Sequence, residues 1–139
     1  MYFKMELIKI TSDIEKVKSI LDTAELIESR IKIQDRNTFI SLITSDYYEI
    51  IKELLTALLL IDGYKTLSHK DLVDYLEMYY KDFEKKEIRT IDSLRIYRNR
   101  VAYEGFKISQ DYLANNELDF KQIIKRLKSL INKRLKEEK

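Results

Sequence analysis

The sequence predicts an all-α protein, folded as a single-domain helical bundle of five to six helices. Three observations lead to this class. Apolar residues recur at steps of three and four along nearly the whole chain, which is the period of an amphipathic helix. The chain contains no proline and only two glycines, so few residues would interrupt its helices. No strand-like alternation of apolar and polar residues persists beyond the first ten residues.

Composition sets bounds on the possible functions. Hydrophobic residues make up 45% of the 139 residues and charged residues 36%, a mixture that supports one core beneath a charged surface. One domain over residues 1–139 is therefore expected, with a charged C-terminal tail at about 134–139. The net charge of +2 requires any RNA site to be a local basic patch. The absence of cysteine and the single histidine argue against a metal or a thiolate centre, so we expect no metal and no cofactor.

The N-terminal stretch "MYFKMELIKI" has lysines and a glutamate among its apolar residues, so it lacks the core of a signal peptide. No run of the chain approaches the ~20 apolar residues of a membrane span. These features predict a cytoplasmic protein without a membrane partner.

Two long helices are expected in the first half of the chain. Ser12 and Glu15 form a candidate capping box for the first one. Its inward face is predicted to contain Ile14, Val17, Leu21, Ala24, Ile27 and Ile31. A second helix is expected to begin near Asp35 and to end before Gly63, and it is apolar on nearly all sides over "LLTALLLI", residues 54–61. This pattern identifies it as the central helix.

Further helices are expected in the second half. Ser68 is a plausible N-cap for a third helix, whose inward side is predicted to be Leu72, Tyr75, Leu76, Tyr79 and Phe83. A fourth helix has its apolar stripe at Ile88, Ile91, Leu94 and Val101, with Arg98 in the same register, and ends at Gly105. Ser109 is predicted to cap a short helical turn. A separate last helix would then place Leu118, Ile123, Leu127, Leu130 and Ile131 inward, before a fraying tail.

The stretch "SLRIYRNRVAYEGFKIS", residues 93–109, puts an arginine into an apolar stripe. At ~100° per residue, Arg98 lies near that stripe, while Arg95, Asn99 and Tyr103 share a neighbouring strip. A guanidinium keeps its proton and is costly to bury alone, so Arg98 must meet a carboxylate, helix-end carbonyls, a subunit interface or a ligand phosphate. One interpretation is a structural ion pair with Glu49 or Glu53 of the central helix.

The segments "YYEIIKELLTALLLIDGYKTLSHKDLVDYL" and "LRIYRNRVAYEGFKIS" resemble the HEPN family (higher eukaryotes and prokaryotes nucleotide-binding domain), small all-α proteins that are common in archaea and bacteria. The resemblance extends from about Tyr47 to Ile131. The family motif is an arginine, usually followed by a polar residue such as asparagine, and a histidine after an interval of about four to six positions. Arg98 and Asn99 match its start, and Tyr103 occupies the place of the histidine.

The resemblance implies metal-independent RNA cleavage in active family members, by attack of a 2′-hydroxyl on the adjacent phosphate. Arg98 would stabilise the phosphate, Asn99 would orient it, and Tyr103 would donate a proton but hardly accept one, because a phenol has a pKa of ~10. Arg95 and Glu104 are the neighbouring candidates for ligand binding. The only histidine, His69, is interpreted as a first-turn residue beside the Ser68 cap and is left outside the site.

Some family members carry a tyrosine two positions after the histidine, which a partner nucleotidyltransferase modifies with adenylate to silence the toxin. Gly105 stands at that place here, so Tyr103 would be a displaced acceptor.

Two functions follow from these residues. The first is a non-catalytic HEPN-type module that binds nucleotide, RNA or a partner protein in a dimer cleft. The alternative is the RNase toxin of a toxin–antitoxin pair with a small nucleotidyltransferase. Because residues 54–61 are apolar on nearly all sides and need cover on more than one of them, we expect a homodimer with Arg98 near its interface. The basic residues of "KQIIKRLKSLINKRLK" are interpreted first as a solvated face and second as an RNA contact.

Overall fold

The structure is a computed structural model that describes residues 5–138, so the two ends of the expected 1–139 domain lie outside the described residues. The all-α class is confirmed, with five helices in the described part of the chain. These are α1 (Ile14–Ile33), α2 (Ile40–Asp62), α3 (His69–Tyr79), α4 (Lys85–Glu104) and α5 (Gln110–Glu137). Two short antiparallel strands, β1 (Ile8–Lys9) and β2 (Tyr64–Lys65), pair Ile8 with Lys65.

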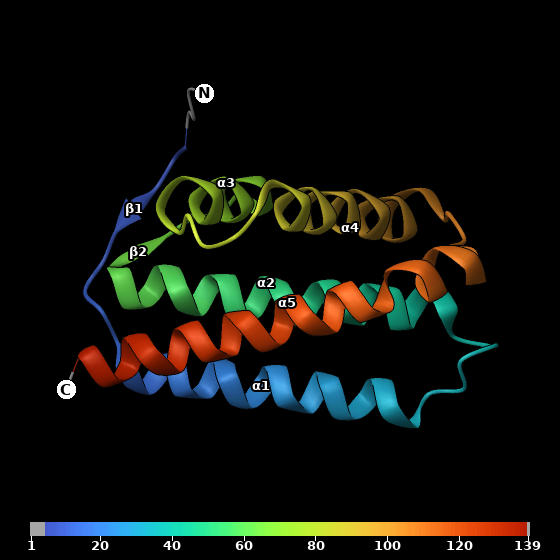
Figure 1. Cartoon of the computed structure of the whole chain (residues 1–139), viewed down its shortest axis with the longest axis horizontal. Coiled ribbons are helices and arrows are strands. Elements are labelled where there is room, and N and C mark those ends of the chain that lie inside the picture. The colour runs from blue at the N-terminus through green and yellow to red at the C-terminus, as the bar shows by residue number, and fades with distance from the viewer. Residues whose placement is uncertain (1–4, 139) are drawn as a thin grey trace.

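Helix α2 is the centre of the bundle, as predicted, and packs against each of the other helices. Figure 1 shows α3 and α4 in a layer above α2, with α1 and α5 along its other sides. Residues 54–61 are buried in the single chain, apart from the half-buried Thr56. The chain itself therefore covers this apolar helix, and the argument that a dimer must cover it is wrong. The homodimer stays a prediction that needs another reason.

The starts of the first two helices differ from the sequence-based prediction. The cap of α1 is Asp13 rather than Ser12, because the Asp13 carboxylate accepts a hydrogen bond from the backbone N–H of Lys16 at 3.1 Å. Helix α2 begins at Ile40 rather than near Asp35. The Asp35 carboxylate accepts hydrogen bonds from the Thr38 hydroxyl and, at 3.4 Å, from the backbone N–H of Asn37, so it closes a turn before the helix starts.

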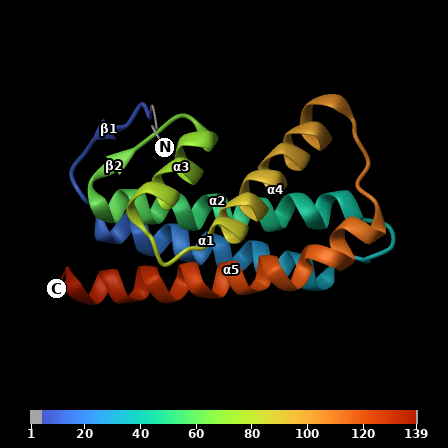
Figure 2. The same ribbon diagram turned by 45° about the horizontal axis from the view of Figure 1, so that its top comes forward.

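The chain reverses after α2 and positions α3 over the middle of that helix. Gly63 ends α2 with a φ of 89°, in the left-handed region, and a Cβ there would lie 3.2 Å from the carbonyl oxygen of Ile10. The segment 64–68 then runs back along α2 before α3 begins, as Figure 2 shows. Ser68 caps α3, as predicted, by accepting the Asp71 N–H at 3.3 Å.

The inward face of α3 is shorter than predicted. Leu72, Tyr75 and Leu76 are buried, but Tyr79 is exposed at the last position of the helix. Phe83 is buried from the loop that follows, rather than from the helix itself.

Helix α5 is one continuous helix where a short turn and a separate helix were predicted. Ser109 caps it through the Tyr112 N–H at 3.2 Å, and the helix then runs to Glu137. Leu118 is exposed rather than inward, because it lies about 200° around the helix from the buried Phe120. The segment expected to fray is helical as far as Glu137, and Arg134 within it contacts Asp62 and Tyr80. None of the described helices combines the length and apolar character needed to cross a bilayer.

Candidate functional site

Arg98 of α4 faces α2 and forms the ion pair that the sequence suggested as its structural explanation. Its Nη2 lies 3.0 Å from Oε1 of Glu49, and the two side chains are only 22% and 23% exposed. The other terminal nitrogen, Nη1, donates a hydrogen bond to Oδ1 of Asn99 at 3.3 Å. The structure therefore brings Arg98 and Asn99 together at the α2–α4 contact.

Glu49 is shared between two cations. Lys52 Nζ lies 2.8 Å from Glu49 Oε2 and 3.3 Å from Glu53 Oε1. Burial alone would lower the pKa of Lys52, but these two carboxylates outweigh it and raise that pKa above its ordinary value. Glu49 Oε1 is buried and accepts no well-aligned hydrogen bond from the described residues, since Arg98 approaches it out of line. Glu49 thus combines strong ion pairing with incomplete hydrogen bonding.

His69 lies beside this pair, although sequence reasoning left it outside the site. Its ring centroid is 5.9 Å from that of Tyr48, and the Arg98 guanidinium carbon is 5.9 Å from the same Tyr48 ring. Burial lowers the pKa of His69 below its ordinary value, and the positive charges of Lys52 and Arg98 lower it further. The imidazole is therefore neutral near pH 7 and able to accept a proton.

The length of the link before His69 is a signal in the sequence for the position of this residue. Six residues link the end of α2 to the start of α3. An extended chain of that length spans at most ~20 Å, the length of ~13 helical residues. A segment that returns along α2 can therefore place the first residue of α3 as far back as residues 48–52, where Tyr48, Glu49 and Lys52 lie.

Arg95 also belongs to this group. It is largely buried, and its Nε donates a hydrogen bond to Asp92 Oδ1 at 2.9 Å within α4. Its positive charge acts on both Tyr48 and His69 by lowering their pKa values, although burial keeps the pKa of Tyr48 above its ordinary value. We define the Arg98 cluster as Glu49, Lys52, His69, Arg95, Arg98 and Asn99.

Tyr103 and Glu104 lie apart from the Arg98 cluster, at the exposed C-terminal end of α4. Tyr103 is 78% exposed. Glu104 is exposed and faces Arg100 of its own helix at 4.0 Å. Five residues along a helix correspond to a rotation of about 140°, so Tyr103 points away from the face that carries Arg98. The motif spacing therefore does not bring Arg98 and Tyr103 together within one chain.

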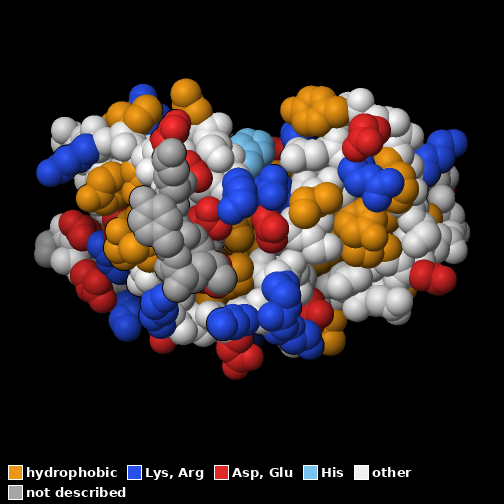
Figure 3. All heavy atoms as spheres, turned by 90° about the horizontal axis from the view of Figure 1, so that it is seen from above, with side chains coloured by type: hydrophobic (Ala, Val, Ile, Leu, Met, Phe, Trp, Pro, Cys, Tyr) orange, Lys and Arg blue, Asp and Glu red, His pale blue; other side chains and the backbone are white. Residues whose placement is uncertain are grey.

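Figure 3 looks onto the side of the molecule that carries α3 and α4. The chain's only histidine, in pale blue, lies in a hollow between the two lobes, with basic and acidic side chains directly beside it. The cations Lys52, Arg95 and Arg98 are matched by the carboxylates of Glu49, Glu53 and Asp92. A ligand phosphate must therefore be held by guanidinium donors that these carboxylates leave free, rather than by an excess of charge.

Comparisons of the chain with protein-family models, with curated proteins and with solved structures give no match.

Proposed function

We propose that this protein is a HEPN-like RNA-binding module, and that the Arg98 cluster holds a phosphate of the RNA backbone. The observation that carries this proposal is the approach of Arg98 and His69, from two helices, to the same Tyr48 ring, with Asn99 hydrogen-bonded to Arg98. A guanidinium has five N–H donors, and the contacts to Glu49 and Asn99 leave several of them free for a phosphate. RNA also offers unstacked bases, which the half-buried ring of His69 can meet.

One variant pair tests this binding. Arg98→Ala is expected to weaken the binding of a fluorescent single-stranded RNA by ~10-fold, because it removes a charge-assisted contact to phosphate. Arg100→Ala is the matched control, since Arg100 lies on the same helix but is stacked on Phe106 at 3.9 Å, outside the cluster. Fluorescence anisotropy at fixed salt measures both. Equal losses in the two variants would leave only non-specific charge attraction and contradict the proposal.

A second candidate function is metal-independent RNA cleavage, and the placement of His69 favours it. In this reaction a neutral His69 takes the proton of a ribose 2′-hydroxyl, and the 2′-oxygen forms a bond to the adjacent phosphorus. The bond from phosphorus to the 5′-oxygen breaks, and that oxygen takes a proton from water. Arg98 stabilises the crowded phosphate, and the products carry a 2′,3′-cyclic phosphate and a 5′-hydroxyl.

One assay distinguishes RNA binding from RNA cleavage. Purified protein is incubated with total RNA, and the RNA ends are analysed for cyclic phosphate. Cleavage that His69→Gln and Arg98→Ala both abolish would support the enzyme. RNA that is bound through Arg98 but stays intact would support the binding module.

The partners predicted from the sequence remain part of the proposal. The exposed apolar side chains of Ile96 and Tyr103 offer a surface for a homodimer on the face of α4 that is turned away from Arg98. The exposed Tyr103 hydroxyl is also accessible to a nucleotidyltransferase that would add adenylate. Light scattering at tens of micromolar protein tests the dimer, and a strictly monomeric species would contradict it.

A further inference from the structure

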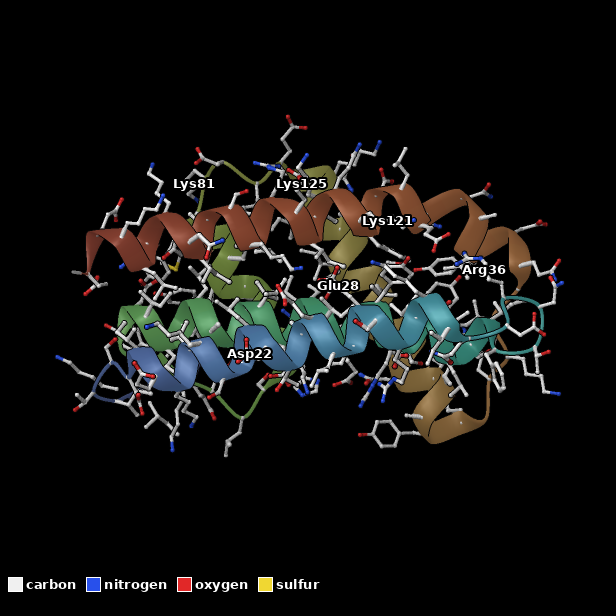
Figure 4. All side chains as sticks on the ribbon, turned by 90° about the horizontal axis from the view of Figure 1, so that it is seen from below. Asp22, Glu28, Arg36, Lys81, Lys121 and Lys125 are labelled. Carbon is white, nitrogen blue, oxygen red and sulfur yellow. The ribbon has the colours of Figure 1, made fainter. Side chains whose placement is uncertain are left out.

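A second hollow lies on the side of α2 away from the Arg98 cluster, between α1 and α5. These two helices pack on α2 rather than on each other, which leaves a groove between them. The groove contains a cavity of about 390 Å³, within the range of small-molecule sites. In Figure 4, which looks onto this side, Glu28 of α1 and Lys121 of α5 extend toward the gap between the two ribbons, and Arg36 stands at its end.

Ion pairs between the two walls cross the groove at either end of this cavity. Lys128 of α5 pairs with Glu28 of α1 at one end. Arg36, just beyond α1, pairs with Glu117 of α5 at the other. Beyond the Lys128–Glu28 pair, a further hollow between α1 and α5 is lined by Ile14 and Leu135.

Between the two ion pairs the pocket carries uncompensated positive charge. Lys32, Lys121 and Lys125 line it and are exposed. Within residues 5–138, none of the three has a carboxylate at ion-pair distance. Three free ammonium groups around one cavity create a positive potential that attracts an anion. This arrangement differs from the Arg98 cluster, where carboxylates match the cations.

The floor of the pocket is apolar. It consists of Ile31, Tyr47 and Ile124, all buried. The Tyr47 hydroxyl donates a hydrogen bond to Glu117 Oε2 at 2.5 Å, so its polar end is already occupied. Burial raises the pKa of Tyr47, and the bond to Glu117 raises it further, which keeps the ring neutral. The floor therefore suits a flat apolar or aromatic group.

From this arrangement we propose that the pocket between α1 and α5 binds a small phosphorylated ligand with an apolar or aromatic body. The phosphate lies among Lys32, Lys121 and Lys125, and the body packs on Ile31, Tyr47 and Ile124. The volume of the cavity and its buried apolar floor favour a small molecule over an RNA strand or an acidic helix. The site shares no residue with the Arg98 cluster, so this proposal can be tested independently of the function proposed above.

Titrations followed by two-dimensional NMR test this site with three probes: phenyl phosphate, inorganic phosphate and benzyl alcohol. Phenyl phosphate is expected to shift the amide signals of Ile31 and Ile124 saturably. Inorganic phosphate and benzyl alcohol are expected to bind at least ~5-fold more weakly, because each probe lacks one half of the ligand. Phenyl phosphate that binds no more tightly than inorganic phosphate would overturn the proposal.

Charge variants complete the test. The double variant Lys121→Ala/Lys125→Ala is expected to weaken phenyl phosphate ~10-fold, and since both side chains are exposed the fold should persist. Lys9→Ala/Lys81→Ala removes the same charge elsewhere on the surface and should change the affinity less than ~2-fold. Equal losses in both double variants would overturn the proposal. So would a single-stranded RNA that shifts the same amide signals while phenyl phosphate does not.

Discussion

Arginine–carboxylate pairs join α2 to other helices, and the pairs of Asp62 and Glu49 differ in how completely their polar atoms are bonded. At the end of α2, Asp62 pairs with Arg134 of α5 and accepts hydrogen bonds from the hydroxyls of Tyr75 at 2.7 Å and Tyr80 at 2.6 Å. Arg134 in turn donates to the Tyr80 hydroxyl at 2.8 Å. At the middle of α2, Glu49 pairs with Arg98, but its buried Oε1 accepts no aligned hydrogen bond from the described residues.

The side chains of both pairs are mostly buried, so burial alone does not separate their roles. Buried polar groups are nearly always hydrogen-bonded, and the Asp62 network follows that rule. Burial raises the pKa values of Tyr75 and Tyr80, and the bonds to Asp62 raise them further, which keeps both hydroxyls as donors. A complete network of this kind holds α2, α3 and α5 together. Arg98 has fewer partners than Arg134, so more of its N–H groups are free to meet a ligand.

The largest effect should come from breaking the complete network. Asp62→Ala leaves Arg134 and two tyrosine hydroxyls without their acceptor, so we expect the free energy of unfolding to fall by about 3 kcal/mol. Urea denaturation measures this loss. Asp22→Ala is the control, because Asp22 is exposed on α1, and it should cost less than ~0.5 kcal/mol. A loss below ~1 kcal/mol for Asp62→Ala would show that the network does not secure the fold.

A smaller loss of stability is expected at Arg98. Arg98→Ala leaves Glu49 with its ion pair to Lys52, so the free energy of unfolding should fall by only about 1–2 kcal/mol. The same variant should lose RNA binding while it stays folded, so the loss of binding can be measured apart from the loss of stability. Arg98→Lys should recover most of the stability but not the binding, because an ammonium cannot replace the planar guanidinium fork. A loss of ~3–5 kcal/mol for Arg98→Ala would assign Arg98 a purely structural role.

The comparison of the two arginine–carboxylate pairs also shows which features of the fold and of the site could be predicted from the sequence. Helical periodicity and the capping residues Ser68 and Gly105 predict local structure, and the structure confirms them. The partner of Arg98 was predictable too, because a buried guanidinium needs a carboxylate and Glu49 lies on the central helix. Both predictions follow from strong physical needs of single groups: helix ends need caps, and a buried guanidinium needs a carboxylate.

The remaining features depend on how the chain folds back on itself. His69 reaches the Arg98 cluster because the segment after Gly63 returns along α2, which the length of that segment permits but no local pattern requires. Tyr103 looked suitable because a family motif was read as linear spacing, whereas the helix turns it away from Arg98. The pocket between α1 and α5 combines lysines from distant segments, each of which resembles an ordinary solvated residue in the sequence.

Titration of His69 should have a smaller effect than either arginine–carboxylate pair. Its pKa lies below its ordinary value of ~6.5, so the unfolded chain takes up a proton at a higher pH than the folded protein does. Stability from this group is thus present above about pH 6.5 and is lost as the pH falls toward the folded pKa. Chemical denaturation between pH 7.5 and 5 should show a steeper decline in the parent than in His69→Gln. Equal declines in stability for the parent and His69→Gln would show that Lys52 and Arg98 do not lower the pKa of His69.

The smallest effect is expected at Tyr103, although the family motif places its histidine there. An imidazole with a pKa of ~6.5 can exchange protons near neutrality, and general acid–base catalysis is typically worth ~10²–10⁴-fold in rate. Because Tyr103 is exposed and turned away from the Arg98 cluster, we expect Tyr103→His to change RNA cleavage by less than ~2-fold. A cleavage assay with the parent, Tyr103→His and Tyr103→His/Arg98→Ala measures this. A gain of ~10²-fold in cleavage that Arg98→Ala abolishes would contradict this expectation. Such a gain would mean that residue 103 of one protomer reaches the Arg98 cluster of its partner across the predicted dimer interface.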